Sequence, residues 1–262
     1  MPLRVIGAHN LETSHTRHTC FLLDDVLGID AGSLASALSH QEQRQVQTVL
    51  ITHAHLDHCR DIPALGLATV GAPHPIEVYA LPETLAAIQS HLMDGSFYPD
   101  LSQSLNGDAP RLRLHPIQPG EPFCTAGFTV EALPASHPVP ALGYIVRKAG
   151  NRTIGYTGDS TGDLLPFLQR DASPDVLFVD VTFPDRLGAR AEASGHLTPA
   201  ALGQRLARAQ SLGLKLPRVI PIHLDIQHAP EVMRELAEVG AHFGLDLSPA
   251  YEGMTLDEGG LV

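Results

Sequence analysis

The most constraining feature of this sequence is a group of four metal-binding side chains within six residues. The run His-Ala-His-Leu-Asp-His follows directly from the apolar segment 47–52, which we predict to be a strand. In extended geometry His53, His55 and Asp57 point to one side, because side chains alternate along a strand. A break near Asp57 then lets His58 turn back toward the same centre. Imidazole and carboxylate groups so arranged indicate a site for zinc, iron or manganese.

Three further metal-binding side chains each follow a strand-like segment, and they are His137, Asp159 and His223. A single polar residue at the end of an apolar strand usually caps a helix or is a satisfied core group. Four strand ends that deliver His or Asp in one chain instead indicate that the side chains meet at a common centre.

The pattern of apolar segments predicts an α/β protein. Segments 20–23 and 26–29 flank Asp24-Asp25 and predict a hairpin, and later in the chain strands alternate with helices at 199–211 and 230–243. The other predicted elements are strands at 76–80, 128–133, 143–148, 153–156, 176–179 and 218–222 and a helix at 82–91. Strand-rich halves that each trail helices predict two packed sheets with helices outside.

The chain shows no internal repeat, low-complexity run or linker, so we expect residues 1–262 to form one domain. The formal charge of −12 disfavours binding of long nucleic acids, which needs clustered Lys and Arg. A small phosphorylated substrate is still compatible with this charge, because bound divalent ions reverse the local sign.

Three cysteines without C-x-x-C spacing indicate neither a disulfide framework nor a zinc ribbon. The first residues lack the charged start and apolar stretch of a signal peptide, and no apolar run approaches the ~20 residues that cross a bilayer. We therefore expect a reduced, cytoplasmic protein that does not associate with membranes.

The H-x-H-x-D-H run, followed by single His, Asp and His residues at strand ends, resembles the metallo-β-lactamase superfamily. The resemblance extends from the turn at 27–32 to His223, and it implies an αββα sandwich of two mixed sheets with outer helices. It also implies two divalent metal ions, with zinc favoured and manganese or iron as alternatives. By the family pattern one ion would be held by His53, His55 and His137, the second by Asp57, His58 and His223, and both would be bridged by Asp159.

One position departs from the family pattern, because Asp61 stands where the family usually has glycine. Such a glycine commonly supplies a positive φ, which Asp tolerates better than most residues. We therefore expect a turn at Asp61 that still forms, with some strain.

Two later segments, 178–184 (FVDVTFP) and 191–199 (AEASGHLTP), resemble the phosphodiesterase branch of the superfamily. In that branch, which includes class II cyclic-nucleotide phosphodiesterases and tRNA 3′-processing nucleases, the histidine of the second segment helps protonate the leaving oxygen. The resemblance assigns this role to His196, with Asp180 as its orienting partner. The alternative is that His196 merely precedes a helix capped by Thr198.

We predict hydrolysis of a 3′,5′-cyclic nucleotide or a similar small phosphodiester. By the resemblance, a metal-bridging hydroxide oriented by Asp57 attacks phosphorus while His196 protonates the departing oxygen. The cyclic-nucleotide enzymes are favoured over the tRNA nucleases because the hairpin at 20–33 resembles theirs. The sequence also lacks the basic, glycine-rich arm with which the nucleases grip tRNA.

Other functions stay open at this point. A tRNA 3′-processing endonuclease and a thioesterase or lactonase use the same fold, since the same metals polarise carbonyl groups. From another class, diiron oxidoreductases generally carry Glu where this chain has His55. An inactive metal-binding protein is a further alternative. The oligomeric state is also open, and a homodimer is a candidate because dimers are common among similar proteins.

Overall fold

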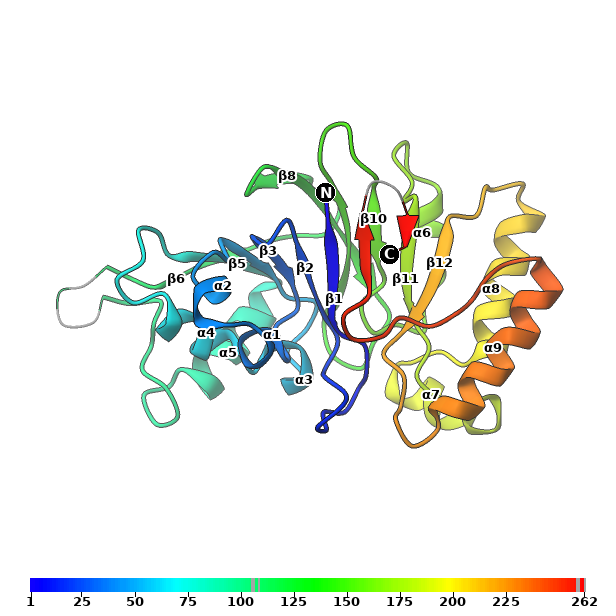
Figure 1. Cartoon of the computed structure of the whole chain (residues 1–262), viewed down its shortest axis with the longest axis horizontal. Helices are drawn as coiled ribbons and strands as arrows, with labels where there is room; N and C mark the ends of the chain where they lie inside the picture. The colour runs from blue at the N-terminus through cyan, green and yellow to red at the C-terminus, as the bar shows by residue number, and fades with distance from the viewer. Residues whose placement is uncertain (105–106, 108, 258–259, 262) are drawn as a thin grey trace.

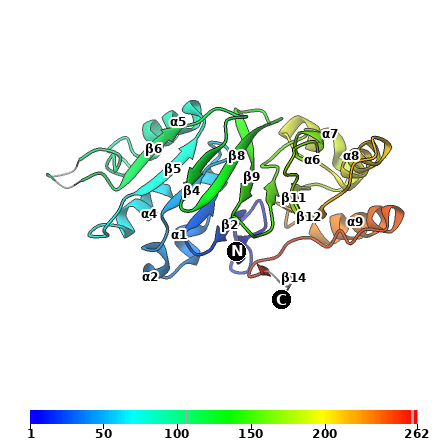
Figure 2. The same cartoon turned by 90° about the horizontal axis from the view of Figure 1, so that it is seen from above.

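The computed structural model describes residues 1–104, 107, 109–257 and 260–261. It has two mixed β-sheets packed against each other, with helices on the two outer sides (Figure 1). Viewed from above, α1, α2, α4 and α5 lie on one side of the sheets, and α7, α8 and α9 lie on the other (Figure 2). This is the α/β sandwich that the sequence predicts.

The first sheet has eight strands in the order β14-β13-β1-β2-β3-β4-β5-β6. Its strands are β1 (Leu3–Gly7), β2 (Cys20–Leu23), β3 (Leu27–Ile29), β4 (Thr48–Leu50), β5 (Ile76–Ala80), β6 (Leu112–Pro116), β13 (Thr255–Asp257) and β14 (Gly260–Leu261). Strands β3 to β6 run parallel, whereas β1 pairs antiparallel with β2 and β13.

The second sheet has six strands in the order β12-β11-β10-β9-β8-β7. Its strands are β7 (Phe123–Thr125), β8 (Phe128–Ala135), β9 (Ala141–Arg147), β10 (Ile154–Tyr156), β11 (Val176–Asp180) and β12 (Arg218–Ile222). Strands β10, β11 and β12 are parallel, and β7, β8 and β9 form an antiparallel meander.

The helices that cover the first sheet are α1 (Leu34–Ala37), α2 (His40–Gln43), α3 (Leu56–Cys59), α4 (Ile62–Ala68) and α5 (Pro82–Leu92). Those on the side of the second sheet are α6 (Leu165–Leu168), the 3₁₀ helix η1 (Asp185–Leu187), α7 (Gly188–Ser194), α8 (Pro199–Ser211) and α9 (Ala229–Phe243). None of the helices in the described part of the chain combines the length and the apolar character that a bilayer-spanning segment needs.

The predicted hairpin forms between β2 and β3, and its turn explains the two adjacent acidic residues. Asp24 and Asp25 both have positive φ, at 48° and 59°. The Leu23 carbonyl accepts from the Val26 backbone, so Asp24 and Asp25 are the central residues of a turn. A turn of this hand matches the right-handed twist of the strands, and Asp is among the residues that tolerate it. Beneath the hairpin the two sheets share one core, in which Phe21 contacts Tyr156 and Phe178 with ring centroids 5.0 and 4.8 Å apart.

Candidate metal centre

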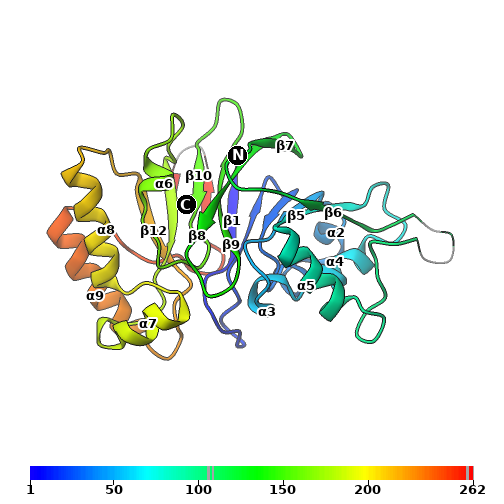
Figure 3. The same ribbon diagram turned by 180° about the vertical axis from the view of Figure 1, so that it is seen from behind.

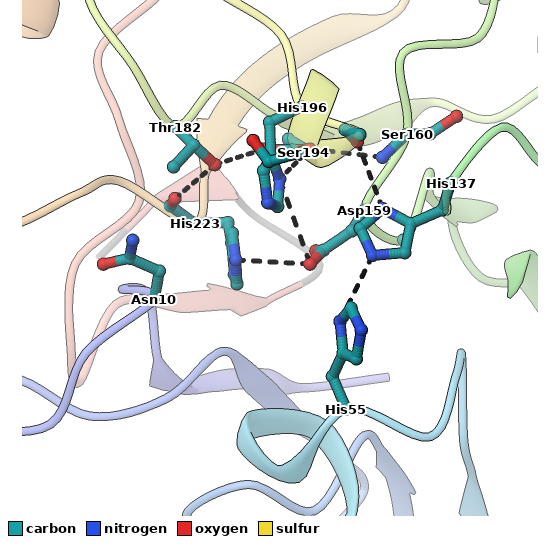
Figure 4. Close-up of polar contacts among 12 residues, drawn as sticks. Asn10, His55, His137, Asp159, Ser160, Thr182, Ser194, His196 and His223 are labelled. Carbon is teal, nitrogen blue, oxygen red and sulfur yellow. Dashed lines mark hydrogen bonds and ion pairs between the residues drawn. The ribbon is translucent and has the colours of Figure 1, made fainter. Parts of the chain in front are cut away.

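The predicted ligands meet at one edge of the sandwich because the strands that precede them end there. The segments that follow β4, β8, β10 and β12 carry His53, His137, Asp159 and His223 respectively. Carboxyl ends of parallel strands lie at the same edge of a sheet, and ligands commonly bind there in α/β proteins. Figure 4 shows His55, His137, Asp159 and His223 pointing toward one another from these segments.

The local geometry of the H-x-H-x-D-H run differs from the sequence prediction. Strand β4 ends at Leu50, so His53, His55 and Asp57 do not lie along one extended strand. Thr52 instead donates its backbone N–H to the Asp30 carboxylate, and the chain turns into the short helix α3 with His55 at its N-cap position. Asp57 and His58 therefore reach the centre from a helical turn rather than by strand alternation.

The ligand atoms form two neighbouring groups. One group contains His53, His55 and His137, and the other contains Asp57, His58, Asp159 and His223; within each group the candidate atoms lie within 4.8 Å of one another. Asp159 lies between them, because its Oδ2 is 3.8 Å from His53 Nε2, 3.2 Å from His58 Nε2 and 3.3 Å from His223 Nε2. The structure thus brings the seven predicted ligands together in two neighbouring groups; that they bind two ions, with Asp159 as the bridge, stays a prediction.

The unpaired atoms of this cluster fit two metal ions. The His58 Nε2 and Asp159 Oδ1 atoms are buried and have no hydrogen-bond partner, which is costly unless another group binds them. His55 Nδ1 lies 3.0 Å from His53 Nε2 and 3.2 Å from His137 Nε2, so several ring nitrogens face one small space. Nitrogen and carboxylate donors in this number suit zinc, iron or manganese.

The protonation states also favour metal binding. Burial and the neighbouring His58 lower the pKa of His53 well below its usual value, and burial and His137 lower that of His55. Burial likewise lowers the pKa of His137 and His223, so these four rings are neutral and offer lone pairs. Without a bound cation, the carboxylates of Asp159, Asp57 and Asp30 overcome burial and raise the pKa of His58 instead.

Residues that the sequence analysis did not assign to the site orient these rings. Asp30 is fully buried and its Oδ2 accepts from His58 Nδ1 at 2.8 Å, while the Thr19 hydroxyl lies 3.0 Å from His223 Nδ1. The backbone carbonyl of Gly195 accepts from His137 Nδ1 at 3.2 Å. Such partners fix the ring orientation of metal-binding histidines. Asp30 lies in the turn at 27–32 and Gly195 in the segment 191–199, both of which carry the family resemblance, whereas no sequence signal indicated Thr19.

Replacing Asp30 by Asn should lower metal affinity about 10–100-fold, because the variant removes the charge that orients His58. Asn tolerates the positive φ of 59° at this position, so the backbone should stay in place. Metal titration of the purified protein measures the effect. Asp24→Asn is the matched control, since Asp24 also has a positive φ but lies in the turn of the hairpin and pairs with Lys148, which follows β9. Equal metal affinity of Asp30→Asn and the wild type would contradict the assigned role.

His196 and Asp180 lie beside the ligand cluster and are in contact. His196 Nδ1 is 2.9 Å from Asp180 Oδ2, and Asp180 also accepts from the Thr182 hydroxyl and the Ser160 backbone. Burial disfavours a charged His196, but Asp180 outweighs it and raises the pKa of His196 to about 9. The Asp180 side chain therefore reaches the histidine. The catalytic roles of both residues stay predictions.

Gly195 allows the loop before His196 to approach the ligands. Its φ is +87°, and a Cβ atom there would lie 2.3 Å from His137 Nδ1 and 2.4 Å from Pro138 Cδ. No L side chain fits without displacing His137.

Gly195→Ala should therefore destabilise the protein by about 1–3 kcal/mol more than Gly213→Ala, because overpacking adds to the backbone strain. Gly213 is the control, since it also has a positive φ (+69°) but a Cβ there would meet nothing within 4 Å. Denaturant unfolding in the presence of a chelator measures the difference. An equal loss of unfolding free energy in both variants would show that a side chain at position 195 does not clash with His137.

The structure corrects the expectation for Asp61. Its φ is −84° and ψ is −4°, which is ordinary right-handed geometry, so no strain arises from the missing glycine. Asp61 precedes α4, and its side chain accepts a hydrogen bond from the Ser36 backbone. The aspartate therefore ties α4 to α1.

A pocket of about 360 Å³ opens beside the ligands. Its wall includes Asn10, Leu11 and His18 from the segment between β1 and β2, together with Leu56 and Arg60. Leu11 and Leu56 are 41% and 59% exposed and therefore form an apolar rim around a polar floor.

Comparisons with known proteins identify the family and the fold. The profile of the beta-lactamase superfamily domain matches residues 19–224. Ribonuclease Z of Picosynechococcus sp. is 37% identical over 106 residues, which cover 39% of this chain and 30% of the relative. Ribonuclease Z of Pyrococcus horikoshii is 27% identical over 168 residues, which cover 59% of this chain and 52% of the relative. The matched regions thus span only a third to a half of these relatives.

Solved structures match over nearly their whole length. The metallo-beta-lactamase fold protein YhfI of Bacillus subtilis has a TM-score of 0.77 and 20% identity, covering 98% of this chain and 99% of that chain. Yeast PDE1 has a TM-score of 0.79 and 19% identity, and the match covers 97% of this chain and 98% of that chain. Zn²⁺-bound PqqB of Methylobacterium extorquens has a TM-score of 0.69 and 16% identity, covering 98% and 100%. These likenesses show the α/β metallo-β-lactamase fold.

Proposed function

The chain belongs to the beta-lactamase superfamily, and we propose that it is a metal-dependent hydrolase that cleaves a phosphodiester bond. The observation that carries this proposal is the contact between His196 and Asp180 beside the two ligand groups. Breaking a phosphodiester expels an alkoxide, which needs a proton donor close to the metals. Many hydrolases that act on better leaving groups do not need such a donor.

The residues would act as follows. One ion would be held by His53, His55 and His137. The other would be held by Asp57, His58 and His223, and Asp159 would bind both ions. Two such ions, zinc being favoured, would lower the pKa of a water molecule and polarise the phosphoryl oxygens. A water molecule activated in this way would form the new bond to phosphorus as the P–O bond to the leaving group breaks.

His196 supplies the proton that the leaving oxygen needs. Asp180 accepts from Nδ1 and keeps the ring protonated and oriented, so that Nε2–H faces the pocket. The products are a phosphate monoester and a free hydroxyl group. Asp57 lies 3.4 Å from His58 and is one-quarter exposed at the pocket, where we propose that it orients the attacking water.

The sequence relatives support RNA as the substrate better than the cyclic nucleotide that the motifs favoured. Both relatives described above are ribonucleases Z. The formal charge of −12 argues against extended contacts with a long nucleic acid, so we propose a short or terminal RNA segment. A 3′,5′-cyclic nucleotide is the second candidate, because a pocket of about 360 Å³ is suited to a single small ligand.

A direct comparison of substrates tests the choice. Protein loaded with zinc or manganese is incubated with a short RNA and, separately, with 3′,5′-cAMP. We expect cleavage of the RNA to 3′-hydroxyl and 5′-phosphate ends and slower or no formation of 5′-AMP. If cAMP were hydrolysed rapidly and the RNA stayed uncleaved, the cyclic nucleotide would be the better substrate and the preference that we propose would be reversed.

A further inference from the structure

A second hollow lies next to His196, away from the metal-ligand groups. Its volume is about 380 Å³, and it is lined by α7, the start of α8 and Thr161. His196 lines this hollow as well as the pocket beside the ligands. A further hollow of about 410 Å³ adjoins it, and the two share Gln204 and Arg205. Both are lined by residues of α8, and the second hollow also by residues of α7; Figure 3 shows these two helices on the outer side of the six-stranded sheet.

Arg205 places a fixed positive charge where the two hollows meet. Its guanidinium donates to the carbonyl oxygens of Thr161 at 2.9 Å, Ala201 at 3.1 Å and Gly162 at 3.4 Å. A fourth contact, to the side-chain oxygen of Gln204 at 3.4 Å, leaves one of the five guanidinium N–H groups unused.

This charge has no counter-ion within the described residues. The four acceptors of Arg205 are neutral, and no carboxylate of the described chain forms an ion pair with it. Its neighbour Arg208, by contrast, pairs with Asp163 at 2.7 Å. An immobilised guanidinium with a spare N–H is a suitable partner for phosphate.

We propose that this second hollow binds the leaving side of a linear phosphodiester, with Arg205 contacting the next phosphate along the chain. The proposal rests on the proposed function, in which His196 protonates the leaving oxygen. The leaving nucleoside must then lie on the His196 side of the pocket, and the second hollow is the space there. Arg205 and His196 line this same hollow, and Arg205 donates to the carbonyl of Thr161 in the segment that follows Asp159.

The chemistry of the hollow distinguishes two kinds of substrate. In linear RNA the nucleoside that carries the leaving 3′-oxygen has another phosphate at its 5′ position. A cyclic mononucleotide has no such phosphate, and it would leave Arg205 without a partner. The Glu192 side chain also lines the hollow, and its carboxylate suits hydroxyl or amino groups of the nucleoside rather than the phosphate.

The test compares two substrates that differ by one phosphate. The zinc-loaded protein is assayed with the diribonucleotide ApA and with its 5′-phosphorylated form pApA. We expect kcat/KM to be at least about tenfold higher for pApA, and the preference to weaken as ionic strength rises. In Arg205→Gln the two values should become equal, and Arg205→Lys should retain part of the preference because it keeps the charge.

The ratio of the two values does not depend on how much of a variant is folded or metal-loaded, so partial unfolding or incomplete metal loading of a variant cannot mimic the result. Arg234→Ala is the matched control, since Arg234 on α9 also donates to a backbone carbonyl, that of Pro230; it should keep the wild-type ratio. Equal kcat/KM for ApA and pApA in the wild type, or an unchanged ratio in Arg205→Gln, would overturn the inference alone. Cleavage of neither diester with both ions bound would overturn the proposed function as well.

Discussion

His196→Ala should lower kcat for an RNA phosphodiester by about 10²–10⁴-fold while both metal ions stay bound, because a positioned general acid contributes that much. His196 is not in either of the two ligand groups that we assign to the ions. The leaving 3′-oxygen of ribose is strongly basic and depends on the donated proton. The loss should therefore be much smaller with bis(p-nitrophenyl) phosphate, whose leaving group needs no proton.

This dependence on the leaving group separates a catalytic from a merely structural role. A structural defect would lower turnover of both substrates by the same factor. His242→Ala, at the exposed end of α9, is the matched control and should leave both activities unchanged. Near-full turnover of RNA by metal-loaded His196→Ala would show that the proton comes from elsewhere.

Asp159→Ala should have the largest effect of any single substitution, with activity reduced by at least about 10³-fold and fewer than two ions bound per chain. Its carboxylate lies within 4 Å of His53, His58 and His223, so it contributes to both groups. Metal analysis and diester turnover on the same sample measure the two effects together.

The control for Asp159→Ala is Asp246→Ala, in which an exposed carboxylate that binds Ser248 is removed. Metal content and activity should both match the wild type. If Asp159→Ala still bound two ions at wild-type affinity, Asp159 would not bridge the groups, and the ligand assignment would need revision.

The sequence was sufficient to predict the elements that are bounded by strong local signals. The strand at 76–80, the helix at 199–211 and the strand at 218–222 have the predicted bounds, because Pro or turn residues delimit each of them. The candidate ligand residues could also be proposed from local signals, because each is a His or Asp that follows an apolar strand-like segment. Their side-chain chemistry is local, and only their convergence depends on the fold.

The contacts that arrange the site could not be read from the sequence. Asp30 and His58 are 28 residues apart, and Thr19 and His223 are 204 apart, so only the folded sheets bring each pair together. The extended geometry expected for His53 to Asp57 was wrong because Asp30 ends the strand early by binding the Thr52 backbone. The positive φ expected at Asp61 was wrong because the chain enters α4 directly.

The most direct test of the account is to titrate metal-free protein with zinc while both bound metal and hydrolysis of a phosphodiester are followed. We predict that two ions bind per chain, that activity appears as the ions bind, and that a chelator abolishes it. The same activity in metal-free protein, or no hydrolysis of any phosphodiester with two ions bound, would contradict the assignment of this site as a two-metal phosphodiesterase centre.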